Sequence, residues 1–305
     1  MTFQELQKRQ AWSLSQKIDH SLGVIDQFLS KCEAYVSFSG GKDSTVLLDL
    51  CRIVKPDIKA VFCNTGNEYP EIVKFVRDLQ MGGGNIDIIH PEYKIDELIA
   101  IFGFPLVSKD TSYKLWYIRN RPDSKTAQCG LGNKDKRFMV PIKYRYLIDE
   151  PYVCSNKCCD LLKKTPFRKY EREHNCYPIL GTMASESKVR ATQYIKQGSC
   201  NYFAYKNYGH THSLPLSIWM ENDIKAYIKK RNLQICSLYD NGFERTGCMF
   251  CGFGVQFAHD VRLAKLCELH PKWYERCMNY TNNGITYREA LRKLLAVNGL
   301  KLPDE

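Results

Sequence analysis

The sequence predicts an α/β fold in which a parallel, twisted sheet carries helices on both faces. Short apolar runs with the length and composition of buried strands occupy residues 34–38, 58–63, 86–90 and 177–180. Apolar residues at helical spacing follow these runs, over residues 45–54, 70–80, 95–102 and about 186–196. Strands that alternate with helices favour a parallel sheet, because each helix returns the chain to the edge where the next strand starts.

The two ends of the chain are expected to be helical. Apolar residues recur at helical spacing over residues 5–30, which predicts an amphipathic helix at the start of the chain. Residues 256–297 show helical patterns only. We therefore expect one main domain over residues 1–255 and a C-terminal helical extension over residues 256–305.

The composition limits the partners and the location of the protein. Its 305 residues are 44% hydrophobic and 25% charged, so the chain can bury a sizeable core. The formal net charge of +11 favours anionic partners, which include nucleotides, sulfated or phosphorylated small molecules and nucleic acid. The sequence has no apolar run of about 18 residues and no apolar N-terminal signal segment. We therefore expect a soluble, cytoplasmic protein without membrane contact.

A six-residue loop, Ser-Gly-Gly-Lys-Asp-Ser over residues 39–44, joins the first strand to the following helix. Glycines let backbone N–H groups approach phosphate oxygens, and the start of a helix favours negative charge. Lys42 adds a compact positive charge, and Ser39 and Ser44 add hydroxyl donors. A carboxylate is costly beside bare phosphates, so Asp43 is expected to orient the loop or to meet a metal ion. The loop lies at the carboxyl end of a strand, where ligands of parallel sheets bind.

Residues 36–50, which include this loop, resemble the PP-loop of ATP pyrophosphatases, enzymes that cleave ATP between its α and β phosphates. Residues 62–70, 181–190 and 214–224 extend the resemblance to the phosphoadenosine phosphosulfate reductase family. The resemblance implies a Rossmann-like fold of the adenine-nucleotide alpha-hydrolase type. It also implies a bound adenine nucleotide, ATP, together with Mg²⁺.

The resemblance further implies which residues form the site. In such proteins the segment that matches residues 62–70 lies against the adenosine, and Arg190 matches a basic position that binds phosphate or sulfate. The residues assigned to nucleotide binding are Ser37, Ser39, Gly40, Gly41, Lys42, Asp43, Ser44, Thr65, Gly66 and Gly181. Those assigned to catalysis are Lys42, Asp43 and Arg190.

The chain contains fourteen cysteines, and four of them form two close pairs. Cys158 and Cys159 are adjacent, whereas Cys248 and Cys251 form a Cys-x-x-Cys motif. Without a secretory signal, a disulfide framework is disfavoured, and four thiolates suffice for an iron–sulfur cluster or a structural zinc ion. Adjacent cysteines cannot easily both aim at one metal, so Cys154, one turn earlier, is an alternative ligand.

The same four cysteines resemble the [4Fe–4S] pattern of assimilatory adenosine phosphosulfate reductases, in which a Cys-Cys pair precedes a Cys-x-x-Cys motif by some eighty to ninety residues. The resemblance implies a [4Fe–4S] cluster held by both pairs, with a zinc ion or free thiols as the alternatives. There too, basic residues follow the first pair, as at residues 163–168 here. They are expected near the cluster or the nucleotide.

Two features separate the sequence from sulfonucleotide reductases. Those enzymes carry a mobile cysteine near the C-terminus that attacks the sulfate sulfur, whereas this sequence ends without one. Their phosphate loop is usually eroded, whereas residues 39–44 keep the string that suits ATP and pyrophosphate release. We therefore expect an enzyme that activates an acceptor with ATP for sulfur transfer, with a sulfur donor such as a cysteine desulfurase. The alternatives are an adenylyl-sulfate or phosphoadenylyl-sulfate reductase and a non-catalytic nucleotide-binding component of a modification or defence complex.

Residues 104–150 interrupt the alternation of strands and helices, which indicates a basic lid or insertion beside the nucleotide site. Basic and aromatic residues interleave here, among them Trp116, Arg119 and Arg121. Cations neutralise phosphates and aromatic faces stack on unpaired bases, so one interpretation is a surface for a tRNA or DNA acceptor. The other is a lid with packed aromatics and solvated lysines, together with a small-molecule acceptor. The sequence leaves the oligomeric state open.

Overall fold

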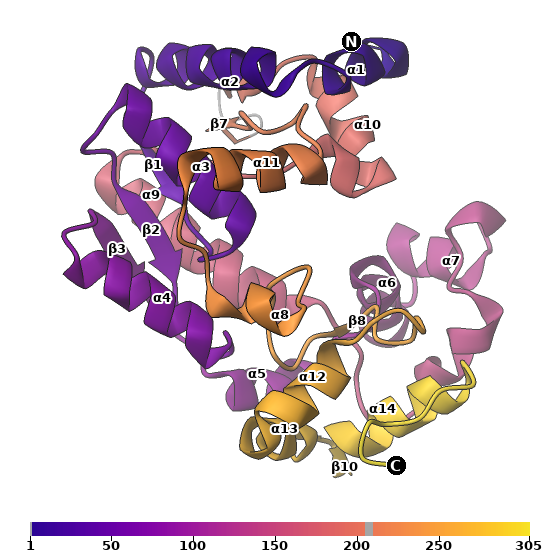
Figure 1. Ribbon diagram of the computed structural model, residues 1–305. Helices are drawn as coiled ribbons and strands as arrows, with labels where there is room; N and C mark the ends of the chain where they lie inside the picture. Colours follow the sequence, from indigo (N-terminus) through magenta and orange to yellow (C-terminus); the bar gives the residue numbers. More distant parts are fainter. Residues whose placement is uncertain (1, 205–209) are drawn as a thin grey trace. The chain divides into compact units, whose positions relative to one another are not determined.

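The structure, a computed structural model, describes residues 2–204 and 210–305 in two compact units (Figure 1). The first unit comprises Met1–Asn64, Pro70–Ile89 and Phe167–Thr246, and the second comprises Thr65–Tyr69, His90–Pro166 and Gly247–Glu305. The expected boundary at residue 255 does not coincide with these limits. The reason is that residues 90–166 leave the sheet between two of its strands and fold with the C-terminal stretch.

A six-stranded, mostly parallel sheet forms the centre of the first unit, in the order β3-β2-β1-β5-β7-β6. Its strands are β1 (Ala34–Ser37), β2 (Ala60–Cys63), β3 (Ile86–Ile89), β5 (Tyr177–Ile179), β6 (Asn201–Tyr202) and β7 (His212–Ser213). Val36 of β1 lies opposite Ala60 of β2 and Ile179 of β5. The predicted parallel sheet is thus confirmed, with two short strands that were not expected: β7 is parallel to β5, and the edge strand β6 is antiparallel to β7.

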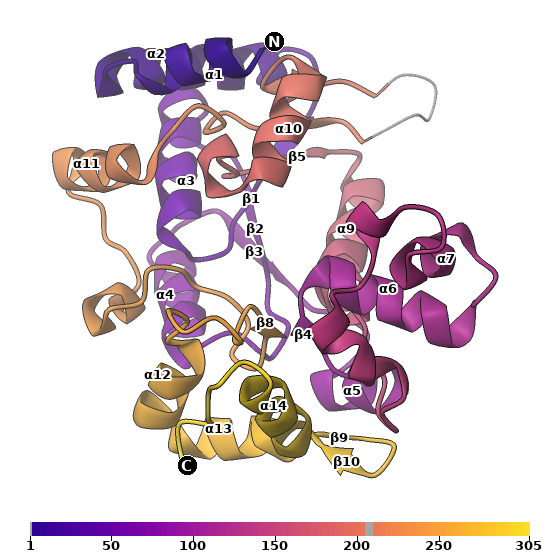
Figure 2. The same cartoon turned by 90° about the vertical axis from the view of Figure 1, so that its right-hand side faces the viewer.

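Helices cover both faces of this sheet, as predicted. They are α1 (Phe3–Gln10), α2 (Leu14–Leu29), α3 (Lys42–Val54), α4 (Pro70–Met81), most of α9 (Thr165–His174), α10 (Lys188–Gln197) and α11 (Glu221–Arg231), with 3₁₀ turns η4 (Ala184–Glu186) and η5 (Ser237–Asn241). Figure 2 shows α3 and α9 on opposite sides of β1, β2 and β3. On the α9 side, Tyr35 of β1 packs against Phe167 and Tyr170.

The single helix expected over residues 5–30 is two helices, α1 and α2. Ser13 is the N-cap of α2: its hydroxyl accepts a hydrogen bond from the Gln16 amide at 3.3 Å. The Gln16 side chain in turn accepts one from the Ser13 amide at 3.0 Å. This reciprocal capping box starts a new helix inside an uninterrupted apolar pattern.

The second unit is largely helical. Its helices are α5 (Ile95–Phe102), α6 (Lys109–Asn120), α7 (Lys125–Leu131), α8 (Lys157–Cys159), α12 (Arg262–Leu269), α13 (Pro271–Met278) and α14 (Tyr287–Ala296), with 3₁₀ helices η1 (Lys136–Phe138) and η2 (Ile142–Ile148) and a π-helical turn η3 (Asp160–Lys164). Two short strands, β4 (Leu106–Val107) and β8 (Gly252–Phe253), pair in parallel. Within the described residues, no helix is long and apolar enough to cross a membrane.

The expectation of helices alone over residues 256–297 is wrong. Strands β9 (Thr281–Asn282) and β10 (Ile285–Thr286) pair as an antiparallel hairpin. Asn283 and Gly284 form its two-residue turn, with φ angles of 50° and 81°. Asn-Gly is a strong signal for such a turn, because both positions require a positive φ.

Candidate functional site

The loop between β1 and α3 makes a sharp turn that only small residues allow. Gly40 has a φ of 70°, and a Cβ there would lie 2.9 Å from Cγ2 of Ile72. Hydrogen bonds fix the turn: the Ser39 amide donates to Oγ of Ser44 at 3.2 Å, and that Oγ lies 2.8 Å from the Gly41 carbonyl. Because the turn is so tight, α3 starts at Lys42, three residues earlier than expected.

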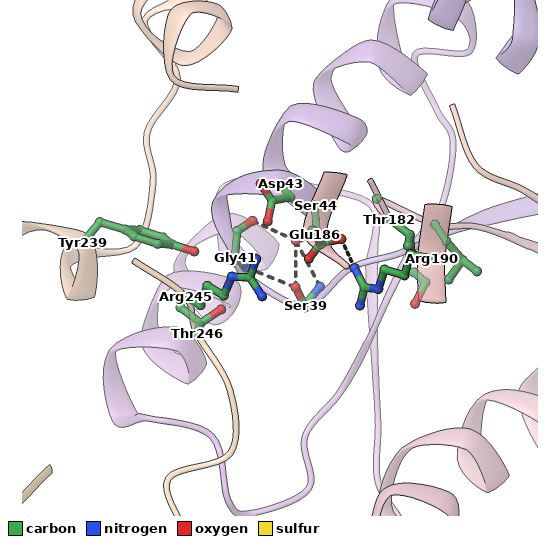
Figure 3. Close-up of a pocket in the computed structure, with 13 residues that line it drawn as sticks. Ser39, Gly41, Asp43, Ser44, Thr182, Glu186, Arg190, Tyr239, Arg245 and Thr246 are labelled. Carbon is green, nitrogen blue, oxygen red and sulfur yellow. Dashed lines mark hydrogen bonds and ion pairs between the residues drawn. The ribbon is translucent and has the colours of Figure 1, made fainter. Parts of the chain in front are cut away.

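This loop opens where the order of the strands reverses. The chain runs from β1 to β2 and β3 on one side of β1, and β5 then lies on the other side. In open α/β sheets, ligands bind at the carboxyl ends of the strands at such a switch point. A cavity of about 280 Å³ lies there, which we call the loop pocket (Figure 3). Its lining comprises Ser37, Ser39, Gly41, Asp43, Ser44, Leu180, Gly181, Thr182, Glu186, Arg190, Tyr239, Arg245 and Thr246.

The loop pocket brings together most of the predicted binding residues of the first unit. At Gly181 the loop after β5 comes close to the loop after β1, because a Cβ there would lie only 3.3 Å from the carbonyl oxygen of Asp43. The two loops that follow β1 and β5 can therefore face one another across one small cavity. Three lining residues, Tyr239, Arg245 and Thr246, were not predicted. They lie shortly before the Cys-x-x-Cys motif, in a segment without regular periodicity. The only pattern in that part of the sequence was the spacing of the cysteines, which does not indicate a phosphate site.

Two arginines supply the positive charge of the loop pocket. Arg190 lies at the start of α10 and forms an ion pair with Glu186. Partial burial and the nearby charge of Arg245 lower the pKa of Arg190, whereas Asp43 opposes this shift. Two guanidinium groups that repel each other in a polar cavity favour a bound anion, and guanidinium geometry matches phosphate oxygens.

Asp43 carries an unsatisfied oxygen. Its Oδ1 is buried without a hydrogen-bond partner, and the closest cation to it is Lys42, whose Nζ lies 3.9 Å away. Burial raises the pKa of the Asp43 carboxyl, and the charge of Lys42 partly offsets that shift. A carboxylate oxygen without a donor beside a phosphate-sized cavity fits Mg²⁺, which binds one or two carboxylates together with substrate phosphates.

Lys42 does not line the loop pocket. Its side chain is only 6% exposed, and its Nζ donates to the Glu244 carbonyl at 2.8 Å and lies 3.3 Å from Oε1 of Glu221. Its backbone amide donates to the Tyr239 hydroxyl at 2.8 Å. The sequence placed the Lys42 charge on the phosphates, whereas the structure directs it toward α11, because two oxygen groups compensate it there.

Thr65 and Gly66, expected against the adenosine, belong to the second unit. The Thr65 amide and hydroxyl both donate to the Glu68 carboxylate, at 2.8 and 2.9 Å. Gly66 has a φ of 73°, so it provides the left-handed residue of this turn. Their contact with a nucleotide stays a prediction.

The four predicted cysteine ligands all lie in the second unit. Cys158 and Cys159 end α8, directly before the π-helical turn η3. Cys248 pairs in a β-bridge with Glu68, and Cys251 closes a turn by donating its amide to the Cys248 carbonyl at 3.2 Å. We call Cys158, Cys159, Cys248 and Cys251 the four-cysteine group.

The thiols of the four-cysteine group act on one another electrostatically. The pKa of Cys158 is raised by its hydrogen bond with Cys159, by burial and by the charges of Cys251 and Cys248. The hydrogen bond with Cys158 lowers the pKa of Cys159 to about 6, and two lysines assist it. Burial raises the pKa of Cys248 to about 11. The two pairs, 88 residues apart in sequence, therefore share one neighbourhood.

Cations surround the four-cysteine group. Lys163, from the predicted basic stretch, lies 3.5 Å from Glu68, and the charges of Cys248 and Glu68 raise its pKa. Lys109 helps to lower the pKa of Cys159. Arg262 is ion-paired with Asp260 at 2.6 Å, and the charge of Cys251 helps to raise its pKa. Positive groups beside thiols favour the thiolate form, which is the form that binds metal.

Among the residues that the structure describes, no group of three His, Cys, Asp or Glu side chains is placed so that it could hold a metal ion. Cys154 is buried elsewhere: burial raises its pKa to about 12, and its charged neighbours are Arg119 and Glu150.

Sequence comparison connects these features to known proteins. A family model described as "Phosphoadenosine phosphosulfate reductase domain" matches residues 33–113 and 130–252. An adenosine 5'-phosphosulfate reductase of Geobacillus kaustophilus is 24% identical over 233 residues, 75% of this chain and 77% of that protein. An uncharacterized protein of Methanocaldococcus jannaschii is 25% identical over 264 residues, 84% of this chain. The chain spans about half of that relative, 51% of its length, and 39% of a second uncharacterized protein of the same organism.

Two solved structures resemble the chain weakly. The phosphoadenylyl-sulfate reductase from Candida auris, solved as a phosphate complex, is 15% identical with a TM-score of 0.46, covering 81% of this chain and 96% of that one. The U34-tRNA thiolase NcsA from Methanococcus maripaludis, with its [4Fe-4S] cluster, is 14% identical with a TM-score of 0.42, covering 86% of this chain and 80% of that one.

We predict that Arg190→Ala and Arg245→Ala each weaken the binding of inorganic pyrophosphate roughly tenfold, because hydrogen bonds to charged groups contribute about 1.5–3 kcal/mol. Isothermal titration calorimetry of the full chain with Mg²⁺ measures this. Arg77→Ala is the matched control, because Arg77 is an exposed arginine of α4 that does not line the loop pocket. Equal affinities for all three variants and the unmodified chain would contradict the site.

Proposed function

The chain belongs to the phosphoadenosine phosphosulfate reductase family, and we propose that it is an ATP pyrophosphatase-type enzyme that activates an acceptor for sulfur transfer. The observation that carries the proposal is the loop pocket. It combines an intact phosphate loop, two arginines and the unsatisfied carboxylate oxygen of Asp43 at the switch point of the sheet. A triphosphate with Mg²⁺ satisfies all three, because it supplies anionic oxygens to the arginines and a cation to the carboxylate.

The residues of the loop pocket have separate roles in this reaction. Ser39, Ser44 and the loop backbone bind phosphate oxygens, and Arg190 and Arg245 neutralise the charge that develops on the leaving pyrophosphate. Asp43 would hold Mg²⁺, which would screen the charge of the triphosphate. An acceptor oxygen attacks the α-phosphorus, the bond to the β-phosphate oxygen breaks, and pyrophosphate leaves. A sulfur nucleophile from a donor protein, such as a persulfide of a cysteine desulfurase, then attacks the acceptor carbon, and the C–O bond to AMP breaks. The S–S bond that still joins acceptor and donor is cleaved by a dithiol reductant, which supplies two electrons and leaves the sulfur on the acceptor.

The runner-up is an adenylyl-sulfate or phosphoadenylyl-sulfate reductase, which the Geobacillus relative favours. A reductase of this kind needs a cysteine thiolate that attacks sulfur. The last two cysteines of the sequence are poorly suited to such an attack. Cys277 is buried, with its pKa raised to about 12, and burial also raises the pKa of Cys267. The third candidate, a non-catalytic nucleotide-binding component, needs the same pocket but releases no product.

We predict that the chain releases pyrophosphate from ATP and Mg²⁺ in the presence of bulk tRNA or DNA, and releases no sulfite from either sulfonucleotide with a thioredoxin reductant. Asp43→Ala should abolish the release, because the carboxylate holds the metal, whereas Asp57→Ala, an exposed aspartate of the same unit, should not. Phosphate and sulfite assays measure the two products. Steady sulfite production makes the reductase correct, and ATP binding without either product favours the non-catalytic component.

A [4Fe–4S] cluster held by the four-cysteine group is the second part of the proposal. The mutual electrostatic contact of the four thiols and the cations Lys109, Lys163 and Arg262 support it. When bound, such a cluster would exchange single electrons, with each of its four irons held by one of the four thiolates. Zinc is the alternative occupant of the same thiols.

We predict that the chain purified without oxygen is brown and contains about four irons and four sulfides. Cys248→Ser and Cys251→Ser should bleach it, because each removes a thiolate. Cys32→Ser is the matched control, because Cys32 lies in the first unit, outside the four-cysteine group. Iron analysis and absorption spectroscopy decide the result. Colourless protein with one equivalent of zinc would replace the cluster by a structural zinc site.

Two of the arginines that the sequence suggested for contact with an acceptor are engaged inside the second unit. Arg119 is not available for phosphates, because its guanidinium donates to the carbonyl oxygens of Glu150 and Tyr152, at 2.7 and 2.5 Å. Arg145 similarly donates to the Leu131 carbonyl at 3.0 Å. These two arginines hold the second unit together, so their replacement would test stability rather than binding.

The exposed part of the basic stretch lies between residues 121 and 143. This segment carries six lysines and arginines against two aspartates. Phe138 is 54% exposed, and the cationic groups of Lys114 and Arg137 lie 5.9 and 5.8 Å from its ring centre. An exposed ring among cations suits an unpaired base with its phosphates, so we propose single-stranded nucleic acid as the acceptor.

We predict that the full chain binds single-stranded RNA or DNA with a steep salt dependence. Lys134→Glu with Lys136→Glu should reduce the salt slope by about 1.4, because each single-strand phosphate contact contributes about 0.7. Phe138→Ala should cost about 1–3 kcal/mol of stacking. Filter binding against tRNA, single-stranded DNA and duplex DNA measures both.

The control for this experiment is Lys8→Glu with Lys196→Glu, an equal change of charge at exposed lysines of the first unit. If the control pair lowers the slope as much as the test pair, binding reflects only the overall charge. Absent or salt-insensitive binding to all three nucleic acids makes a small-molecule acceptor the better hypothesis.

A further inference from the structure

A second cavity of the first unit, of about 330 Å³, has a lining different from that of the loop pocket. It lies between α11 and residues 235–244. Its lining comprises Lys42, Glu221, Lys225, Ile228, Lys229, Ile235, Tyr239, Phe243 and Glu244. Among the described residues, Tyr239 alone lines both cavities. We call this the α11 cavity.

One wall of the α11 cavity is a single face of α11. Glu221, Lys225, Ile228 and Lys229 recur at intervals of three and four residues, so they share that face. The helix is anchored to α3, because Tyr227 and Arg231 both hydrogen-bond to Oδ2 of Asp49, at 2.7 and 3.0 Å. The wall is therefore held in place from behind, which suits a preformed site.

The inner part of the cavity is apolar. Phe243 is buried, and Ile228, Ile235 and the ring of Tyr239 complete this part of the lining. Small-molecule sites are mostly apolar, with a few polar groups that fix orientation, and about 330 Å³ is within their usual range. A polyanion such as a nucleotide triphosphate does not suit such a lining, whereas a compact hydrocarbon or aromatic body does.

The polar part of the cavity is cationic. Three lysines and two glutamates line it. The most buried lysine is Lys42, and its Nζ uses one hydrogen for the Glu244 carbonyl and faces Glu221 at 3.3 Å. An ammonium has three donors, so a third remains for a ligand oxygen. Glu221 also lies 3.9 Å from Lys225, and the lysines that line the cavity outnumber the lining glutamates by one.

We propose that the α11 cavity binds a small organic monoanion, a carboxylate or sulfonate on an apolar body, and that its binding is coupled to that of phosphate ligands in the loop pocket. Lys42 connects the two sites, because it belongs to the phosphate loop while its ammonium lies in the α11 cavity. Tyr239 connects them as well: its hydroxyl accepts the Lys42 amide, and its ring lies 5.4 Å from the Lys42 Nζ. A ligand that shifts either residue changes the loop, and linkage makes the effect reciprocal. The site does not rest on the proposed sulfur transfer.

The test uses the full chain and the aromatic sulfonate 8-anilinonaphthalene-1-sulfonate as the probe. Calorimetry and fluorescence should give one saturable site. Ile228→Trp should abolish it by filling the cavity, and Lys229→Glu should weaken it at least about tenfold, which is about 1.4 kcal/mol. Lys230→Glu is the matched control: this neighbouring lysine of α11 does not line the cavity, so probe affinity should stay the same. Circular dichroism confirms that each variant is folded.

Two results would overturn the proposal. If folded Ile228→Trp and Lys229→Glu bind the probe like the unmodified chain, or if the neutral analogue N-phenyl-1-naphthylamine binds equally well, the cavity does not select an organic anion. If saturating probe leaves the affinity for pyrophosphate unchanged, the coupling is wrong. Pyrophosphate binding without probe is measured in the same experiment, so failure of the loop pocket and failure of the α11 cavity give different results.

Discussion

The close approach of two backbones at the switch point of the sheet determines where chemistry can occur in the first unit. The turn after β1 depends on the positive φ of Gly40, and the loop after β5 comes within contact of Asp43 because Gly181 lacks a side chain. A Cβ at Gly41 would lie 2.8 Å from the Thr246 hydroxyl, so a third segment packs on the same turn. At all three positions, which border the small cavity at the carboxyl ends of β1 and β5, an added side chain would make a tight contact with a neighbouring segment.

Charge in the loop pocket follows from tertiary packing rather than from the loop motif. The motif contains one cation, Lys42, but its ammonium contacts Glu244 and Glu221 and does not line the loop pocket. Arg190 and Arg245 come from α10 and from the segment after η5, and they reach the pocket because those segments pack against the loop. The motif thus contributes backbone shape, hydroxyls and a carboxylate, while the arginines of the pocket come from segments about 150 and 200 residues away in the sequence.

Periodicity and local motifs were enough to predict the sheet and the loop, because both are encoded by contiguous residues. The strands β1, β2, β3 and β5 are apolar runs, and the phosphate loop is a continuous string. Other features depend on contacts between distant residues. Which carbonyls Arg119 caps and which way Lys42 points are set by partners that no local pattern identifies. The hairpin at Asn283 and Gly284 was missed for a different reason: its strands are two residues long, too short to show a period.

The electrostatics of the four-cysteine group explain why cations collect in the second unit. Four thiolates in one neighbourhood repel one another, and burial adds to the cost, as the raised pKa values of Cys158 and Cys248 show. Without compensation the thiols would stay protonated and bind metal poorly. Lys163 and Lys109 act on this group from separate segments, and the carboxylate of Glu68 fixes Lys163 at 3.5 Å. The turn at Thr65 that holds Glu68 is therefore part of the electrostatic environment of the thiols. A segment that the resemblance assigned to the adenosine thus contacts, through Glu68, a cation of the four-cysteine group.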